Sequence, residues 1–329
     1  MSRVRGLLFA GGVLLFIGIL ITHGVPVILA TLSEAGWGLL LVAAFHLLPL
    51  WLDALAIDVL LTGGPSSKLR DTVLARWAGE SANSLLPAGQ IGGPVLMARH
   101  LMFRGLLMSE AAAAITVSTT LQTVAQILFA LLGVMLLGAR ASHLDETTVR
   151  ESALIACFVL GCVVAGFYAL QRRGLYAKLV RASARFRRSG GSSGWMTRAE
   201  SIDQAVQGLY GRPGVVAASF GLSLVGWLAG TGEVFLILLL VGHPVSWLDA
   251  LLIESLGQGI RGAAFAVPGA VGVQEGGYLL LAPLVGLTPD IALGLSLAKR
   301  ARELLLGVPG LLYLHASAGE GARARRGKF

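Results

Sequence analysis

Charged side chains are scarce in this sequence. Asp, Glu, Lys and Arg make up 13% of its 329 residues, whereas soluble proteins contain about 25%. Hydrophobic residues make up 55%. So little charge excludes an ordinary soluble fold. Because apolar segments of about 20 residues cross a membrane as helices, we predict an all-α polytopic membrane protein.

Cysteines and catalytic motifs are also lacking. Cys157 and Cys162 are the only cysteines, and they form no metal-ligand pattern. No G-x-S-x-G, H-E-x-x-H or Walker sequence occurs, so a hydrolase, zinc protease or ATPase has no support. The segment 257–262 matches G-x-G-x-x-G, but no strand–turn–helix unit surrounds it. We therefore expect no enzymatic activity, cofactor, bound metal or nucleic-acid partner.

Basic residues indicate how the chain crosses the membrane, because Lys and Arg collect in cytoplasmic loops. They cluster at the N-terminus, between residues 171 and 212, and after residue 322. This pattern places both termini in the cytoplasm of a bacterial cell, with the chain in the inner membrane. The predicted spans are about 6–24, 36–60, 109–138, 152–170, 214–241 and 291–315.

Two further apolar segments are broken by proline and glycine. The segment of about 77–98 turns at Pro87 and Gly89 and has basic residues at both ends. Its 22 residues cannot cross twice, so we predict a re-entrant hairpin. The segment of about 249–287 turns at Pro268 and Gly269. It is long enough for two full crossings, so a chain with eight or more spans remains the alternative.

The predicted elements form an inverted repeat. Two spans, a hairpin and one span make up each half, residues 1–138 and 139–318, and the halves have opposite orientations. A basic cytoplasmic segment of about 171–212 lies in the second half, and a basic cytoplasmic tail covers 319–329. Transporters with inverted repeats bind their substrate at the interface between the repeats.

The last span carries the densest charge. Lys299, Arg300, Arg302 and Glu303 face one side of the predicted helix. Inserting each charge at this depth costs at least about 2.5–3.5 kcal/mol, so each one is expected to have a structural or functional role. If Glu303 pairs with one cation, two positive charges remain for an anionic headgroup, and Arg binds phosphate through two hydrogen bonds. A purely structural cluster that holds the helix in the bundle is the alternative.

The two hairpins carry the other candidate substrate-binding residues. Glu80, Asn83 and Gln90 belong to the first hairpin, and Glu254, Arg261 and Glu275 belong to the second. Glu275 begins the returning limb, where helix amides favour a negative charge. We expect it to remain ionised and to pair with Arg300 or Arg302, or to couple to a proton. Structural helix pairing is again the alternative role for these carboxylates.

Three motifs carry a resemblance to a known family. They are Glu80-x-x-Asn83-x-x-Leu86-Pro87-x-Gly89-x-x-Gly92-Gly93, Pro268-Gly269-x-x-Gly272-x-x-Glu275 and Lys299-Arg300-x-Arg302-Glu303. Over about residues 5–315 the chain resembles the lysylphosphatidylglycerol synthase transmembrane-domain (flippase-like) family. Within it, the chain is similar to the hopanoid biosynthesis-associated membrane proteins.

The resemblance implies lipid translocation between leaflets, or lipid supply to the envelope. The lysyl synthases also carry a soluble aminoacyl-transfer domain. This chain ends 14 residues after His315, so we expect no soluble domain and no lysine transfer. The cargo would be a hopanoid, a phospholipid or a polyprenyl carrier with an anionic or polar headgroup. The alternatives are a scaffold for lipid-biosynthesis enzymes and an intramembrane lipid-modifying enzyme.

Overall fold

The computed structural model describes residues 36–61, 69–86, 92–140, 146–184, 193–264, 267 and 270–326, and all regular structure in these ranges is helical. Three helical segments are long and apolar enough to cross a membrane, namely α3 (Gly38–Leu61), Met108–Gly138 within α6, and α10 (Pro213–Leu240). The all-α prediction is confirmed. The number of spans remains a prediction, and the first predicted span lies outside the described residues.

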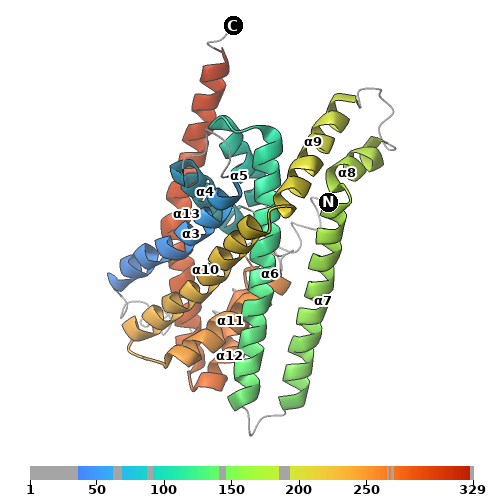
Figure 1. Cartoon of the computed structure of the whole chain (residues 1–329). Coiled ribbons are helices and arrows are strands. Elements are labelled where there is room, and N and C mark those ends of the chain that lie inside the picture. Colours follow the sequence, from blue (N-terminus) through green and yellow to red (C-terminus); the bar gives the residue numbers. More distant parts are fainter. Residues whose placement is uncertain are drawn as a thin grey trace.

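The long helices form an irregular bundle (Figure 1). Helix α3 packs along α10, and α6 (Met108–Arg140) packs against α10 and against α7 (Glu146–Arg172). Helix α13 (Pro289–Arg326) contacts α3, α4, α10 and α12. Several large apolar side chains on these helices are exposed, among them Met135 on α6. Such side chains are suited to contact with lipid.

The first predicted hairpin consists of α4 (Leu69–Leu85) and α5 (Gly92–Phe103), so its limbs extend beyond the predicted 77–98. The two helices pack against each other. The Gly93 N–H at the start of α5 donates a 2.8 Å hydrogen bond to Asn83 Oδ1 of α4. Asn83 therefore joins the two limbs. Pro87, Gly89 and Gln90 lie outside the described residues.

The second predicted hairpin consists of α11 (Trp247–Ala263) and α12 (Val273–Leu281), which leads into a 3-10 turn (Ala282–Val285). Helix α11 begins at Ser246, whose Oγ accepts a hydrogen bond from the Asp249 N–H. In Figure 1 the two hairpins lie toward opposite ends of α13. Pro268 and Gly269 lie outside the described residues.

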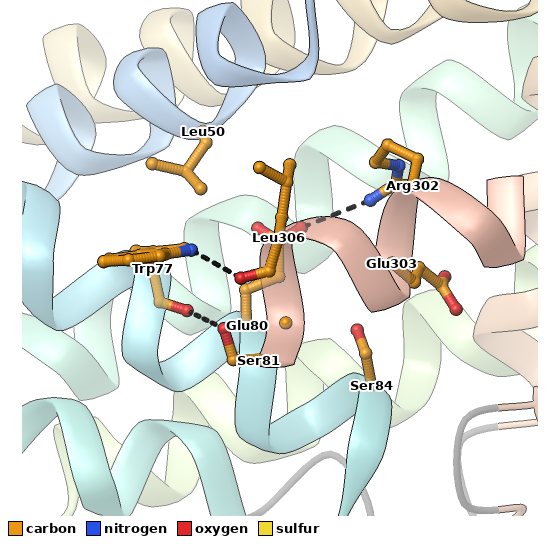
Figure 2. A pocket seen from close by; sticks show the side chains of 9 residues that line it. Leu50, Trp77, Glu80, Ser81, Ser84, Arg302, Glu303 and Leu306 are labelled. Atoms are coloured by element: carbon orange, nitrogen blue, oxygen red, sulfur yellow. Dashed lines mark hydrogen bonds and ion pairs between the residues drawn. The ribbon is translucent and has the colours of Figure 1, made fainter. Parts of the chain in front are cut away.

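Helix α4 is held closely against α13. Trp77 Nε1 donates a 2.9 Å hydrogen bond to the Leu306 carbonyl, and Ser81 Oγ donates a 2.7 Å bond to the Trp77 carbonyl (Figure 2). A Cβ at Gly310 of α13 would lie 3.2 Å from Cε2 of Trp77, and closer still to the Ser81 side chain. Glycine at this position therefore permits the close approach of the two helices.

The basic segment between residues 171 and 212 contains two helices, α8 (Leu175–Ala184) and α9 (Ser193–Tyr210). Asp203 of α9 accepts hydrogen bonds from the N–H groups of Tyr176 and Ala177, at 3.0 and 2.8 Å. These amides belong to the first turn of α8, which has no intrahelical acceptor for them. The carboxylate of α9 thus fixes the start of α8.

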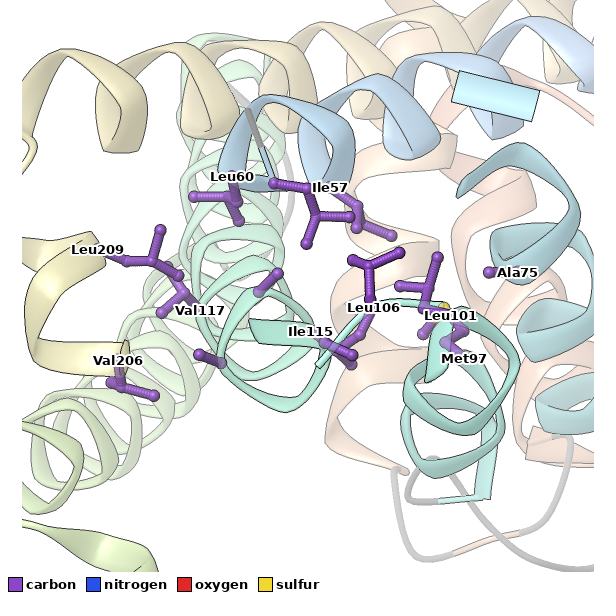
Figure 3. Packing of buried hydrophobic residues seen from close by; sticks show 14 of the residues in the cluster. Ile57, Leu60, Ala75, Met97, Leu101, Leu106, Ile115, Val117, Val206 and Leu209 are labelled. Carbon is purple, nitrogen blue, oxygen red and sulfur yellow. The ribbon is translucent and has the colours of Figure 1, made fainter. Parts of the chain in front are cut away.

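An apolar cluster joins the first hairpin to the rest of the bundle (Figure 3). Its members come from α3, α4, α5, α6 and α9, and they include Ile57, Leu60, Ala75, Met97, Leu101, Ile115, Val117, Val206 and Leu209. Because α5 and α9 meet in the same cluster, the apolar packing ties α9 to the helices that surround the polar interior.

Candidate functional site

A cavity of about 450 Å³ lies between the helices. This volume is within the range of small-molecule sites, roughly 300–1,000 Å³. Charged and amide side chains from α3, α4, α6, α10, α11 and α13 line part of it. Val163, Val164 and Phe167 of α7 also line it, so one wall is apolar. The cavity is therefore amphipathic.

Ion pairs attach the second hairpin to α13. Lys299 Nζ lies 2.5 Å from Glu254 Oε2 of α11, and both side chains are only 3% exposed. Arg261 Nη1 lies 2.8 Å from Glu303 Oε1 and 2.9 Å from an acceptor on α12, Gln274 Oε1. Burying such charges requires partners with good geometry. The arrangement therefore fixes the register of α11 against the last helix.

Glu275 lies at the start of α12, as the sequence predicted. Its Oε2 accepts a 2.7 Å hydrogen bond from the N–H of Gly272. Gly272 has φ +79°, a left-handed conformation that glycine adopts without steric cost. Oε1 of Glu275 contacts Arg300 Nε at 3.1 Å and the Ser296 hydroxyl at 3.2 Å. Arg300, one of the two expected partners, is thus the residue that Glu275 meets.

Arg302 connects α13 to the first half of the chain and to α10. Its Nε lies 3.2 Å from Glu233 Oε1, and its Nη1 lies 3.6 Å from Glu80 Oε1. Figure 2 shows Arg302 directed toward Glu80 across the α4–α13 interface. Nη1 also lies 3.1 Å from Nε2 of His46 on α3. Four helices therefore meet at this guanidinium.

A second polar group connects α3, α4 and α6. Asp53 of α3 lies 2.6 Å from Arg76 Nη2 of α4, and it accepts a 2.7 Å hydrogen bond from Gln122 Nε2 of α6. Gln126, one turn further along α6, donates to the Gln258 carbonyl of α11 at 2.9 Å. Amide side chains of α6 thus contact elements of both halves.

The structure brings most of the predicted site residues to one place. Those that line the cavity are Glu80, Asn83, Glu254, Arg261, Lys299, Arg302 and Glu303. Glu275 and Arg300 form their ion pair beside it. Sequence reasoning missed Glu233 and His46, which also line the cavity. The cost of a charge within an apolar run was a signal that would have identified Glu233.

The prediction that two cations of α13 remain available to a headgroup once Glu303 has paired is wrong. Lys299, Arg300 and Arg302 each meet a carboxylate, and two of the partners, Glu254 and Glu233, come from α11 and α10. Among the described residues, the ion pairs around the cavity contain the carboxylates of Asp53, Glu80, Glu233, Glu254, Glu275 and Glu303, and the cations of Arg76, Arg261, Lys299, Arg300 and Arg302. Carboxylates therefore outnumber Lys and Arg by one.

Comparison with known proteins gives one family. The family model for the lysylphosphatidylglycerol synthase TM region matches residues 4–310, which is most of the chain. No curated protein and no solved structure matches the chain. The match and the apolar helices place the protein in a membrane.

Proposed function

Because the chain belongs to the family of lysylphosphatidylglycerol synthase TM regions, we propose that it is a flippase-type transporter, which moves a membrane lipid from one leaflet to the other. The family suggests a lipid-related function in the membrane. The proposed step is translocation without covalent change to the lipid.

The amphipathic lining of the cavity is the observation that carries this proposal. During translocation, the polar headgroup of a membrane lipid must leave the water, while its apolar chains must stay in the hydrophobic part of the bilayer. The charged wall around Arg302 and Glu80 suits the headgroup, and the apolar wall of α7 suits the start of the chains. A volume of about 450 Å³ accommodates a headgroup while the chains remain in the bilayer.

Headgroup binding would proceed by exchange of ionic partners. Arg302 faces the cavity and already contacts a carboxylate. A phosphate can replace that carboxylate, because guanidinium groups bind both in the same bidentate manner. We propose that an anionic or polar headgroup displaces this contact as it crosses, so that the guanidinium is not left without a partner.

The lengths of the hairpin helices support the six-span reading. Helix α5 has 12 residues and α12 has 9, which correspond to about 18 and 14 Å at 1.5 Å per residue. The hydrocarbon core is about 30 Å thick. We therefore propose two re-entrant hairpins in an inverted repeat, in a bacterial inner membrane, with both termini cytoplasmic. Hopanoids, phospholipids and polyprenyl carriers are the candidate cargoes, and lipid-biosynthesis enzymes are candidate partners.

The test is translocation of labelled lipids in proteoliposomes. The variant Arg302→Gln with Glu233→Gln removes one cation and one carboxylate, which keeps the net charge of the cavity unchanged. We expect its transport rate to fall to the protein-free background. The control is Arg198→Ala on the exposed surface of α9, which should transport like the wild type.

The lipids that co-purify with the two proteins identify the cargo. A lipid class that is enriched with the wild type and lost in the double variant would support the proposal. A folded double variant that transports at the wild-type rate would refute it. Bulk-like lipid with both proteins, and no translocation by either, would favour the scaffold.

A further inference from the structure

His46 lies between two carboxylates that come from different helices. Its Nδ1 is 2.7 Å from Glu233 Oε2 of α10, and its Nε2 is 2.8 Å from Glu80 Oε1 of α4. Both are hydrogen-bond distances. An ionised carboxylate only accepts hydrogen bonds, and a neutral imidazole donates from only one nitrogen. Two contacts of this kind therefore require a proton in addition to those of neutral histidine and two ionised glutamates.

The third neighbour of His46 gives its ring a second stable arrangement. Arg302 Nη1, which is a donor only, lies 3.1 Å from the same Nε2 atom. When Nε2 carries a proton, it donates to Glu80. When Nε2 carries no proton, it accepts a hydrogen bond from Arg302, and Glu80 loses its hydrogen bond to the ring. One proton thus decides which of two side chains Nε2 binds.

The charge balance of the cavity depends on the same proton. Six carboxylates face five Lys and Arg side chains in the ion pairs around the cavity. A protonated His46 makes the charges equal, whereas a neutral His46 leaves one negative charge uncompensated. An unpaired charge in a low-dielectric interior is costly. Charge balance and hydrogen-bond geometry therefore favour the same protonated state.

We propose that His46 is an exchangeable proton site, and that release of its proton switches Nε2 from Glu80 to Arg302. The ring reaches solvent through the cavity, since its side chain is 13% exposed and lines the cavity wall. Glu80, Glu233 and Arg302 contact the ring. The other charged groups that line the same cavity are Asp53 from its own helix, Arg76 from α4, Glu254 and Arg261 from α11, and Lys299 and Glu303 from α13.

The switch has a consequence for transport, and this part rests on the proposed function. Deprotonation of His46 draws Arg302 toward the ring and releases the carboxylate of Glu80 from the ring, which leaves Arg76 as its neighbouring cation on α4. The guanidinium that would hold the headgroup and the carboxylate that competes with it are then both rearranged by a single proton. Headgroup binding and proton binding are therefore coupled, and the transport rate must depend on pH through His46.

Nitrogen-15 NMR of histidine-labelled full-length protein in lipid nanodiscs tests the proton site directly. Comparison with His46→Gln assigns the signals. We expect both ring nitrogens of His46 to carry protons near neutral pH, and the ring to become neutral, with the proton on Nδ1, as pH rises. In Glu80→Gln, we expect the neutral ring to appear at lower pH. A His46 ring that stays neutral from pH 5 to pH 9 in the wild type would overturn the proposal.

Lipid translocation separates this inference from the proposed function. We expect the wild-type rate to change with pH through one titration, and His46→Gln and His46→Lys to lose that change, since neither side chain exchanges a proton near neutral pH. Variants that transport with the wild-type pH profile would refute the proton site and leave the flippase assignment intact. Absence of transport at every pH, together with a titrating His46, would refute the flippase assignment and retain the proton site.

Discussion

The two hairpins place charge in the same cavity by different means. In the described part of the first hairpin, the charged residues that line the cavity come from α4, and its Glu80 is 24% exposed and shared among His46, Arg76 and Arg302. In the second, both limbs contribute ions, and Glu254 and Glu275 are 3% and 1% exposed. The first hairpin therefore presents a partly solvated carboxylate, that of Glu80, with several partners. The second presents dry carboxylates that bind α13 with fixed geometry.

This difference suggests that the second hairpin holds α13 in place, whereas the first hairpin can exchange its ionic partners. A buried ion pair resists any change that removes one partner, so the second hairpin and α13 move as one body. A partly exposed carboxylate loses much less when a partner leaves, because water solvates it. Under the proposed function, the contacts that exchange during transport are consequently expected on the side of the first hairpin.

The largest effect on stability is expected at the buried ion pair of Lys299 and Glu254. Lys299→Ala leaves Glu254 buried without its cation, and we expect a loss of about 3–5 kcal/mol in the free energy of unfolding. Lys299→Met combined with Glu254→Gln removes both charges and should recover most of that loss. Thermal unfolding in matched detergent measures both. A double variant no more stable than Lys299→Ala would contradict the description of this hairpin as an ion-paired body.

Overpacking at Gly310 tests the other way in which a hairpin is attached to α13. Gly310→Val places methyl groups against Ser81 and Trp77, and we expect a loss of about 1–3 kcal/mol. The control is Gly221→Ala on α10, where an added Cβ meets nothing within 4 Å. Equal unfolding temperatures for the two variants would show that α4 does not depend on close contact with α13.

Removal of one hydrogen bond at the same interface should have a smaller effect. Trp77→Phe loses the bond to the Leu306 carbonyl, and the expected cost is about 1 kcal/mol. Trp195→Phe on the exposed surface of α9 is the matched control and should leave stability unchanged. If both substitutions shift the unfolding temperature equally, the hydrogen bond contributes nothing to the attachment of α4.

The smallest stability effect is expected at Glu80. Because this carboxylate is partly solvated, Glu80→Gln should cost below about 1 kcal/mol, whereas Glu254→Gln, which strands Lys299, should cost several-fold more. The same thermal scans compare them directly. Under the proposed function, Glu80→Gln should nevertheless impair lipid translocation. Equal destabilisation by the two substitutions would remove the distinction between the hairpins.

Most of the site residues predicted from the sequence line the cavity, but most of their ion pairs were not predicted. Position along the chain gives depth within a helix, and the proline and glycine breaks marked both hairpins. Helix rotation and tilt decide which ions meet, and a linear pattern contains neither. The expectation that two cations of 299–303 would remain for a headgroup failed for this reason, since Glu254 and Glu233 come from helices distant in sequence.

Three of the charged or titratable residues that were missed lie in the two most apolar helices. His46 and Asp53 of α3, and Glu233 of α10, are single polar groups in long hydrophobic runs. A prediction based on average hydropathy treats such a run as an inert span. The free-energy cost of each such group in lipid is the better guide, because every polar group in an apolar run is then expected to have a partner.

The length of helix α13 has a further consequence. Its 38 residues correspond to about 57 Å, nearly twice the thickness of a bilayer core of about 30 Å. Figure 1 shows its C-terminal part extending past the hairpins. The charged section at residues 299–303 lies in the part that packs in the bundle. A small tilt there swings the far end through a larger arc, so the C-terminal part of α13 moves farther than the charged section whenever the helix tilts.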